Sequence, residues 1–350
     1  RFSFYRNLLT PYTHQYANQC SRMDIYPILL LYYLFKPEII DWPKINNKVS
    51  LKLEHINDAN QLASGMAHDA MIDVEVTVEL AKKCFKEKTM WQYCIGYFDK
   101  KTDSERLHQL KHSALIQQQV YPLAYACSGK LGAKNNFLTP VIGLGSHATY
   151  KNQTLWLRLD QADLLQCQAD SLMENSFVIK RKPAENIFIL PYHERYHHLI
   201  DDQRQQQSQR SLAWCEQHAT LFQQLQRAHQ QFTYPVIEHI DADAALYQLP
   251  FASATQTQRM HQFHQEPAEN KMRLAEQFGS DTLYELALRL VAKHYPERLD
   301  PHQSDAFQQH LQQIYQKTTK NHKNILHSLS DRKPTKTSAL GGLLSSTTTV

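Results

Sequence analysis

The stretch that decides the fold of the first part of the chain reads AHDAMIDVEVTVELAKKCFKE, residues 67–87. Apolar and polar residues alternate strictly from residue 72 to residue 79, which is the periodicity of a β-strand. The run is nevertheless longer than a typical strand, and Asp69 is a suitable N-cap for a helix. A stripe at helical spacing is also present, formed by Met71, Val74, Val78, Ala81 and Phe85. These residues alone therefore leave strand and helix open.

The same stretch holds two residues suited to metal-assisted chemistry. His68 can accept a proton near neutral pH, and Asp73 carries a carboxylate that can hold a hard cation. Phosphodiester hydrolysis needs a divalent cation to steady the phosphate charge and a base to take a proton from water. The alternative interpretation is the polar beginning of an ordinary helix, because two residues at this spacing are a weak signal.

Length and composition indicate a protein of two or three domains with apolar cores. The chain has 350 residues, of which 42% are hydrophobic and 21% are charged. A net charge of +4 does not decide whether nucleic acid is a partner. The six cysteines form no C-x-x-C pair, which argues against a disulfide framework or zinc ribbon and favours a reducing cytoplasm. The longest apolar run, residues 25–35, is about half a bilayer span, so we predict a buried helix and no membrane segment.

The composition and the apolar pattern of the sequence change along the chain. Residues 93–118 are charged and contain glutamines, so we predict a linker with one short helix. Short alternating apolar runs predict a small β domain over residues 119–200. Residues 201–330 are glutamine-rich with apolar residues near helical spacing, which predicts a helical domain. Residues 331–350 are rich in Ser, Thr and Gly without periodicity, and we expect a disordered tail.

A zinc-protease pattern, H-E-x-x-H, occurs at His193 to His197. Two histidines at this spacing on a helix can face one metal ion. Here the pattern follows Pro191 after a strand-like run, and Ile200 stands where the metzincin continuation has glycine. We interpret it as a polar connecting segment.

Six short segments resemble bacterial exodeoxyribonuclease I, a single-strand-specific 3′→5′ DNA exonuclease of the DEDDh superfamily. They are FYRN (4–7), PY (11–12), KPE (36–38), DWP (41–43), LEH (53–55) and HDAM (68–71). The resemblance is specific over residues 1–90, moderate over 121–160 and weak but collinear beyond. It favours a helix for residues 69–87.

The resemblance implies an α+β fold with three parts. Residues 1–92 correspond to the last part of an RNase H-like exonuclease domain, and its first strands are expected to lie upstream of Arg1. An SH3-like domain over residues 119–200 and a C-terminal helical domain over 201–330 follow. We therefore expect an N-terminally truncated relative of this family.

The resemblance also implies roles for the two candidate residues. His68 becomes the general base, and Asp73 becomes a ligand of catalytic Mg²⁺. The family holds two Mg²⁺ ions with four acids, and the other three acids would lie upstream of Arg1. A complete enzyme would release 5′-mononucleotides from single-stranded DNA in repair and recombination. We expect this chain to be inactive alone, because one carboxylate cannot organise two Mg²⁺ ions.

Further positions match residues that bind DNA or a protein in the family. The DNA-contacting positions are Arg1, Tyr12, Tyr16, Lys52 and Asn152. Tyr16 stands where tryptophan is usual, Lys52 stands for an arginine, and Leu30 occupies a position where one family enzyme has an arginine.

A protein partner follows from the resemblance as well. Lys36 and Tyr93 match the pocket that binds the C-terminal tail of single-stranded-DNA-binding protein. An equally acceptable interpretation of Lys36 is a cation at a helix C-terminus. We expect a cytoplasmic monomer. The alternative function is a non-catalytic module that binds single-stranded DNA or a protein tail.

Overall fold

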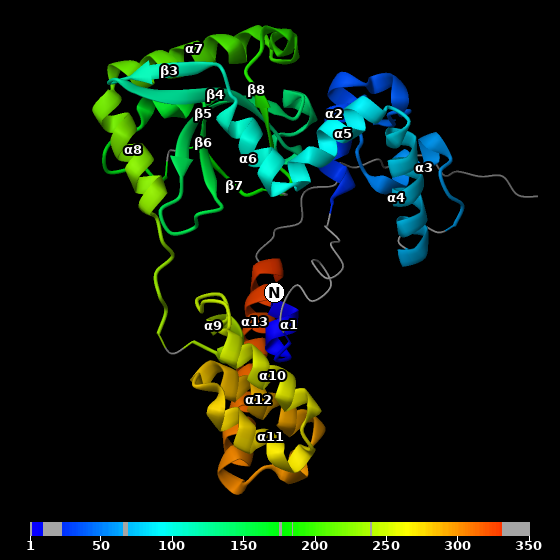
Figure 1. Cartoon of the computed structure of the whole chain (residues 1–350), viewed down its shortest axis with the longest axis vertical. Helices are drawn as coiled ribbons and strands as arrows, with labels where there is room; N and C mark the ends of the chain where they lie inside the picture. Colours follow the sequence, from blue (N-terminus) through cyan, green and yellow to red (C-terminus); the bar gives the residue numbers. More distant parts are fainter. Residues whose placement is uncertain are drawn as a thin grey trace, which may run out of the picture. The chain divides into compact units, whose positions relative to one another are not determined.

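The computed structural model describes residues 2–9, 23–65, 69–174, 177–183, 185–238 and 240–330 (Figure 1). The chain folds as two compact units. The larger unit comprises residues 18–235, and the smaller unit combines residues 1–17 with residues 236–350. Among the described residues, no helix is both long enough and apolar enough to cross a bilayer.

The first helix of the larger unit, α2, is the predicted buried helix. It spans Ile25–Phe35, and the side chain of its N-cap, Asp24, accepts a hydrogen bond from the Tyr26 N–H at 2.9 Å. Pro27 lies in the first turn, where a helix needs no amide donor. All six residues from Pro27 to Tyr32 are buried, so α2 forms the centre of this core. A short hairpin of β1 (Lys44–Ile45) and β2 (Lys48–Val49) follows the 3₁₀ turn η2 (Pro37–Ile39).

Residues 69–87 form a helix, as predicted. Helix α4 spans Ala70–Phe85, and the Asp69 side chain caps it by accepting from the Met71 N–H at 2.8 Å. It packs beside α3 (Leu53–Asn60) and α2. The face of α4 that enters the core carries Val76, Leu80 and Cys84.

The predicted linker over residues 93–118 is wrong, because this segment is ordered and packed. It contains the end of α5 (Lys88–Ile95), the 3₁₀ turn η3 (Gly96–Phe98), helix α6 (Lys100–His108) and strand β3 (Ser113–Ile116). Tyr97 is buried and stacks on Phe188 with ring centroids 4.2 Å apart. Asp103 of α6 is fully buried, and its ion pair with Arg181 compensates the buried charge. Buried partners far along the chain, rather than local composition, order this segment.

A six-stranded antiparallel sheet forms the centre of the larger unit (Figure 1). The strand order is β3-β4-β5-β6-β7, and β8 pairs with residues 124–127 of β4, beyond residues 119–122, which pair with β3. The further strands are β4 (Gln119–Cys127), β5 (Leu138–Ser146), β6 (Thr154–Arg158), β7 (Val178–Arg181) and β8 (Phe188–Pro191). Short 3₁₀ turns connect them: η4 (Gly129–Leu131), η5 (Ala133–Asn135) and η6 (Ala162–Gln166). The predicted β domain is present, and it begins at β3 rather than at residue 119.

Two glutamine-rich helices cover one face of this sheet. After the 3₁₀ turn η7 (Glu194–Leu199), α7 spans Asp202–Gln217 and α8 spans Ala219–Gln231. Their apolar side chains, including Cys215, Phe222 and Leu225, share one core with Leu144 and Leu157 of the sheet. The predicted start of a separate helical domain at residue 201 is therefore wrong. The compact unit continues to residue 235.

The smaller unit is entirely helical in its described part. Its helices are α1 (Phe2–Arg6), α9 (Ala242–Ala245), α10 (Ala254–Gln265), α11 (Ala268–Ala275), α12 (Asp281–His294) and α13 (Pro301–Ser330), with the 3₁₀ turns η8 (Glu276–Phe278) and η9 (Pro296–Arg298). Tyr5 and Leu8 belong to its core, and the Tyr5 hydroxyl accepts from the Ala252 N–H at 3.1 Å. Residues 2–9 thus pack with the C-terminal helices and not with an exonuclease part over 1–92. The predicted tail, 331–350, lies outside the described residues.

Candidate functional site

Four of the predicted site residues cannot be placed. Arg1, Tyr12, Tyr16 and His68 lie outside the described residues. The geometry of His68 relative to Asp73 therefore stays a prediction, as does base stacking on the two tyrosines.

Asp73 lies in the first turn of α4 and is half-buried. Its N–H donates to the Asp69 carbonyl at 2.9 Å, and its own carbonyl accepts from the Thr77 hydroxyl at 2.7 Å. Glu54 and Asp58 of α3 line the same small cavity, of about 70 Å³. This cavity brings three carboxylates near the first turn of α4, where the helix dipole favours negative charge.

Lys52 directly precedes α3, at the N-terminal end of that helix. Its ammonium nitrogen is 3.5 Å from a carboxylate oxygen of Glu54, and the lysine side chain is mostly exposed. Asp73 thus lines this cavity together with Glu54, the residue with which Lys52 forms an ion pair. Burial acts to raise the pKa of Glu54, but a backbone hydrogen bond and the Lys52 ammonium outweigh it and lower that pKa.

The described residues do not fit a two-metal centre. No three His, Cys, Asp or Glu side chains within the described ranges converge on a point where a metal ion could bind. Asp73, Glu54 and Asp58 share a cavity, but their carboxylates do not meet as ligands. Asp73 could supply one ligand of such a centre.

A larger groove surrounds Asn152. Its volume is about 760 Å³, and it lies between α6 and the sheet, with Gln226 of α8 also in its lining. Lysine and amide side chains line the groove, among them Lys100, Lys151, Asn152, Gln119 and Gln226. Trp156 and the buried Asp103–Arg181 pair lie at its floor. Cations and amides around an elongated groove suit a phosphate backbone.

Sequence reasoning missed most of this groove. Lys100 precedes Asn152 by 52 residues and lies in the segment that was predicted as a linker. One signal could have found Trp156: in the alternating run of β6 it points to the sheet face opposite Leu155 and Leu157. Leu30, by contrast, is fully buried in α2, so no DNA contact is possible at that position.

Lys36 and Tyr93 lie on two helices that pack together. Lys36 follows the last residue of α2, and its ammonium nitrogen is 3.8 Å from Glu87, which precedes α5. Tyr93 of α5 is hydrogen-bonded through its hydroxyl to that of Tyr97 at 3.0 Å, and burial raises its pKa. The Arg106 guanidinium stacks 4.4 Å from the Tyr93 ring centroid. Arg106 is thus a cation beside this aromatic, and the sequence alone did not single it out.

The two histidines of the H-E-x-x-H pattern have separate contacts. His193 precedes η7 and accepts a hydrogen bond from the Arg195 N–H at 3.1 Å through Nδ1. The His197 ring packs edge-on against Tyr125 and Tyr192. The segment is a 3₁₀ helix, in which residues four apart do not share a face as they do in an α-helix.

Comparison with known proteins gives matches in both halves of the chain. Residues 240–340 match the family model of the exonuclease I C-terminal domain. Exodeoxyribonuclease I of Escherichia coli K12 is 31% identical over 188 residues, which is 52% of this chain and 38% of that protein. The Haemophilus influenzae protein of the same name is 32% identical over 188 residues, again 38% of its length.

The chain is similar in sequence to bacterial exodeoxyribonuclease I. It spans about two fifths of the length of the curated relatives that it matches. A solved complex of E. coli exonuclease I with single-stranded DNA superposes with a TM-score of 0.73 at 22% identity, covering 95% of this chain and 73% of that chain. This match confirms the predicted fold class, an α+β exonuclease I architecture with a helical C-terminal part.

Proposed function

We propose that this chain contributes to an exodeoxyribonuclease I, which hydrolyses single-stranded DNA in the 3′→5′ direction to 5′-mononucleotides in cytoplasmic DNA repair and recombination. The observation that carries the proposal is the sequence match to exodeoxyribonucleases I of two bacteria. Helix α4 supports it, because Asp69 caps this helix and presents Asp73 in the first turn.

In this proposal the residues of the chain bind and orient the strand. Lys100 and Lys151 neutralise phosphates along the groove, and the Asn152 amide supplies a neutral donor and acceptor. Lys52 supplies a further cation beside Asp73. Bound Mg²⁺ would stabilise the phosphate charge, with Asp73 as one ligand. The chain by itself binds DNA without cutting it, because the described residues do not complete the metal centre.

Binding of single-stranded DNA tests the groove. We expect a labelled oligonucleotide to bind the full chain in low salt, to stay intact with Mg²⁺, and to dissociate as salt rises. Lys151→Glu combined with Asn152→Ala should weaken binding roughly tenfold and reduce the salt slope by about 1. Fluorescence anisotropy across a salt series measures both quantities.

A matched control keeps this test specific. Lys86 is an exposed lysine that does not line the groove, and Lys86→Glu makes the same change in net charge as Lys151→Glu. Equal loss of binding in both variants would show non-specific attraction and contradict a binding groove. Loss of the oligonucleotide with Mg²⁺ would contradict the expected inactivity of the chain alone.

We propose a protein partner for the surface around Lys36 and Tyr93, namely the acidic C-terminal tail of single-stranded-DNA-binding protein. One solved structure is an SSB/exonuclease I complex. Lys36 at the end of α2 pairs with Glu87, which precedes α5, and the Arg106 guanidinium lies over the ring of Tyr93 in α5. A surface that binds the C-terminal carboxylate of an apolar tail needs a cation next to apolar side chains. The chain would act as a monomer in this complex.

Peptide binding tests this partner. We expect Lys36→Glu to weaken binding of a tail peptide roughly tenfold to hundredfold, because a like charge then faces the carboxylate. Isothermal titration with the intact peptide and with its C-terminal amide measures the effect. Lys36→Arg should keep the affinity. If the amide binds as tightly as the acid, carboxylate recognition at this surface is disproved.

The alternative function is a non-catalytic module that binds single-stranded DNA or a protein tail. The absence of a three-ligand metal cluster within the described ranges favours it. Nuclease activity on addition of further exonuclease I polypeptide would decide against it.

A further inference from the structure

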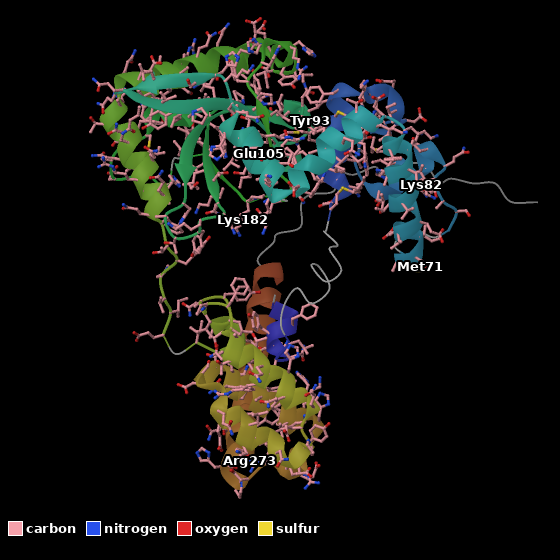
Figure 2. All side chains as sticks on the ribbon, in the orientation of Figure 1. Met71, Lys82, Tyr93, Glu105, Lys182 and Arg273 are labelled. Carbon is pink, nitrogen blue, oxygen red and sulfur yellow. The ribbon has the colours of Figure 1, made fainter. Side chains whose placement is uncertain are left out.

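The connection between β5 and β6 carries two of the side chains that line the groove around Asn152. It comprises residues 147–153, and we call it the β5–β6 turn. Its Lys151 and Asn152 lie in the groove lining. Lys182, labelled in Figure 2, directly follows Arg181, which pairs with Thr154 in the sheet register. Lys182 therefore marks the end of the sheet at which the turn lies.

The sequence of the β5–β6 turn does not explain by itself why the turn is ordered. Tight hairpin connections have two residues and use glycine or asparagine at positive φ. This connection is longer, and it contains neither glycine nor proline. The backbone N–H groups of such a turn need hydrogen-bond partners from elsewhere.

The imidazole of His147 supplies two of these partners. His147 is only 2% exposed, and its Nδ1 accepts from the Thr149 N–H and from the Tyr150 N–H, both at 3.1 Å. Its Nε2 lies 2.7 Å from the carbonyl oxygen of Phe232, the C-cap of α8. Since the two amides require Nδ1 to be an acceptor, the proton is on Nε2, which donates to Phe232. The neutral ring thus uses both of its nitrogens in hydrogen bonds to the backbone.

The end of α8 holds the same turn through backbone and amide groups. The Ala148 N–H donates to the Gln230 carbonyl at 2.8 Å, and the Gln230 side-chain amide donates to the Leu144 carbonyl at 2.6 Å. His147 combines the two sets of bonds, because one ring contacts the turn and the segment that ends α8. Its loss would release the turn on both sides.

We propose that His147 is a positioning residue for single-stranded DNA in the groove. The proposal rests on the proposed function. The neutral Nε2–H form of the ring holds the β5–β6 turn in one conformation, so that Lys151 and Asn152 are in place before the strand arrives. A side chain that is already ordered binds a phosphate without the entropy cost of ordering it. His147 is buried and acts through these two residues.

A cycle of variants tests this role. His147→Ala should weaken binding of single-stranded DNA roughly threefold to tenfold, because the turn must then be ordered on binding. In a chain that already carries Lys151→Ala and Asn152→Ala, the same change should cost less than about twofold, because the positioned groups are gone. Fluorescence anisotropy with one labelled oligonucleotide in low salt measures all four chains. Equal losses in both backgrounds, or no loss in either, would overturn the proposal.

Rescue by a conservative residue separates positioning from packing. In His147→Asn the side-chain oxygen can accept from the N–H groups two and three residues later, as in an Asx-turn, so the affinity should stay within about twofold. His147→Leu fills the space of the ring but offers no acceptor, and it should bind as weakly as His147→Ala. If the asparagine variant binds no better than the leucine variant, the positioning role is disproved.

A control histidine and a spectroscopic signature complete the test. His198 is exposed and does not line the groove, so His198→Ala should leave the affinity unchanged. Nitrogen-15 NMR of the histidine-labelled original chain should show a neutral Nε2–H ring whose signals are missing from the spectrum of His147→Asn. A His147 ring protonated on Nδ1 would overturn the proposal even if the alanine variant fails to fold.

The outcomes also separate this role from the proposed function. If Lys151→Ala with Asn152→Ala weakens binding and His147→Ala does not, the positioning role fails and the DNA groove is supported. If Lys151→Ala with Asn152→Ala binds as tightly as the original chain, the groove fails, and the positioning role fails with it.

Discussion

Replacing Arg181 by methionine should lower the free energy of unfolding of the larger unit by about 3–5 kcal/mol. The side chains of Arg181 and Asp103 are each only 1% exposed, and the two form an ion pair between β7 and α6. The Arg181 Nε also donates to the Ile187 carbonyl at 3.0 Å. Methionine keeps most of the volume and leaves the Asp103 carboxylate buried without its cation. Denaturant unfolding followed by tryptophan fluorescence measures the loss.

Two further variants separate charge burial from packing. Arg181→Met combined with Asp103→Leu should recover most of the loss, because no uncompensated charge remains. Lys182→Met removes the neighbouring cation, whose pair with Glu185 is half-exposed, and should change stability by less than about 1 kcal/mol. A double variant as unstable as Arg181→Met would contradict this explanation. The Asp103–Arg181 pair also lies at the floor of the groove around Asn152, so Arg181→Met should weaken single-stranded DNA binding.

Replacing Asp160 by asparagine should cost roughly 3–5 kcal/mol at pH 7, because two guanidinium groups lose their counter-charge. The Asp160 side chain is 1% exposed and accepts from Arg204 at 2.6 Å and from Arg158 at 3.1 Å. Burial acts to raise its pKa, but hydrogen bonds from Arg158, Gln161 and Arg204 outweigh burial and lower it.

The lowered pKa fixes the direction of the pH dependence. The unfolded chain binds a proton at Asp160 near its ordinary pKa of 3.8, and the folded chain does so only at lower pH. The stabilisation is therefore present above about pH 4 and is lost as pH falls through the folded pKa. Unfolding curves at pH 7 and pH 3 should show the difference between Asp160→Asn and the original chain shrinking in acid. Asp163→Asn, at an exposed acid of η6, should be nearly neutral at both pH values.

Sequence reasoning succeeded where the signal was local. The α2 helix follows from its apolar run. For α4, the length of the run and the Asp69 cap left strand and helix open, and the family resemblance favoured the helix. The apolar stripe from Met71 to Phe85 in the sequence has the helical period that α4 shows. It could not show that Val76, Leu80 and Cys84 would enter the core while the stripe stayed exposed. That choice depends on α2 and α3, which pack against α4 from elsewhere in the sequence.

Sequence reasoning failed where distant residues decide the structure. Segment 93–118 has a polar composition, yet Asp103 finds its cation 78 residues later in β7. The groove around Asn152 similarly needs α6 beside the sheet. Asp73 and Lys52 were singled out by the family resemblance alone, and their roles stay predictions. Nothing in their spacing shows that α3 and α4 pack together.

The packing of Tyr5 and Leu8 against the C-terminal helices constrains the order of events during synthesis. Tyr5 is synthesised 247 residues before its partner Ala252. At a synthesis rate of about 5–20 residues per second, helix α1 lacks its core partners for roughly 12–50 s. During this interval the larger unit can fold, while the apolar side chains of Tyr5 and Leu8 lack their core and stay accessible to chaperones. A ribosome that stalls before residue 252 would therefore display a folded sheet and an N-terminal segment without its core.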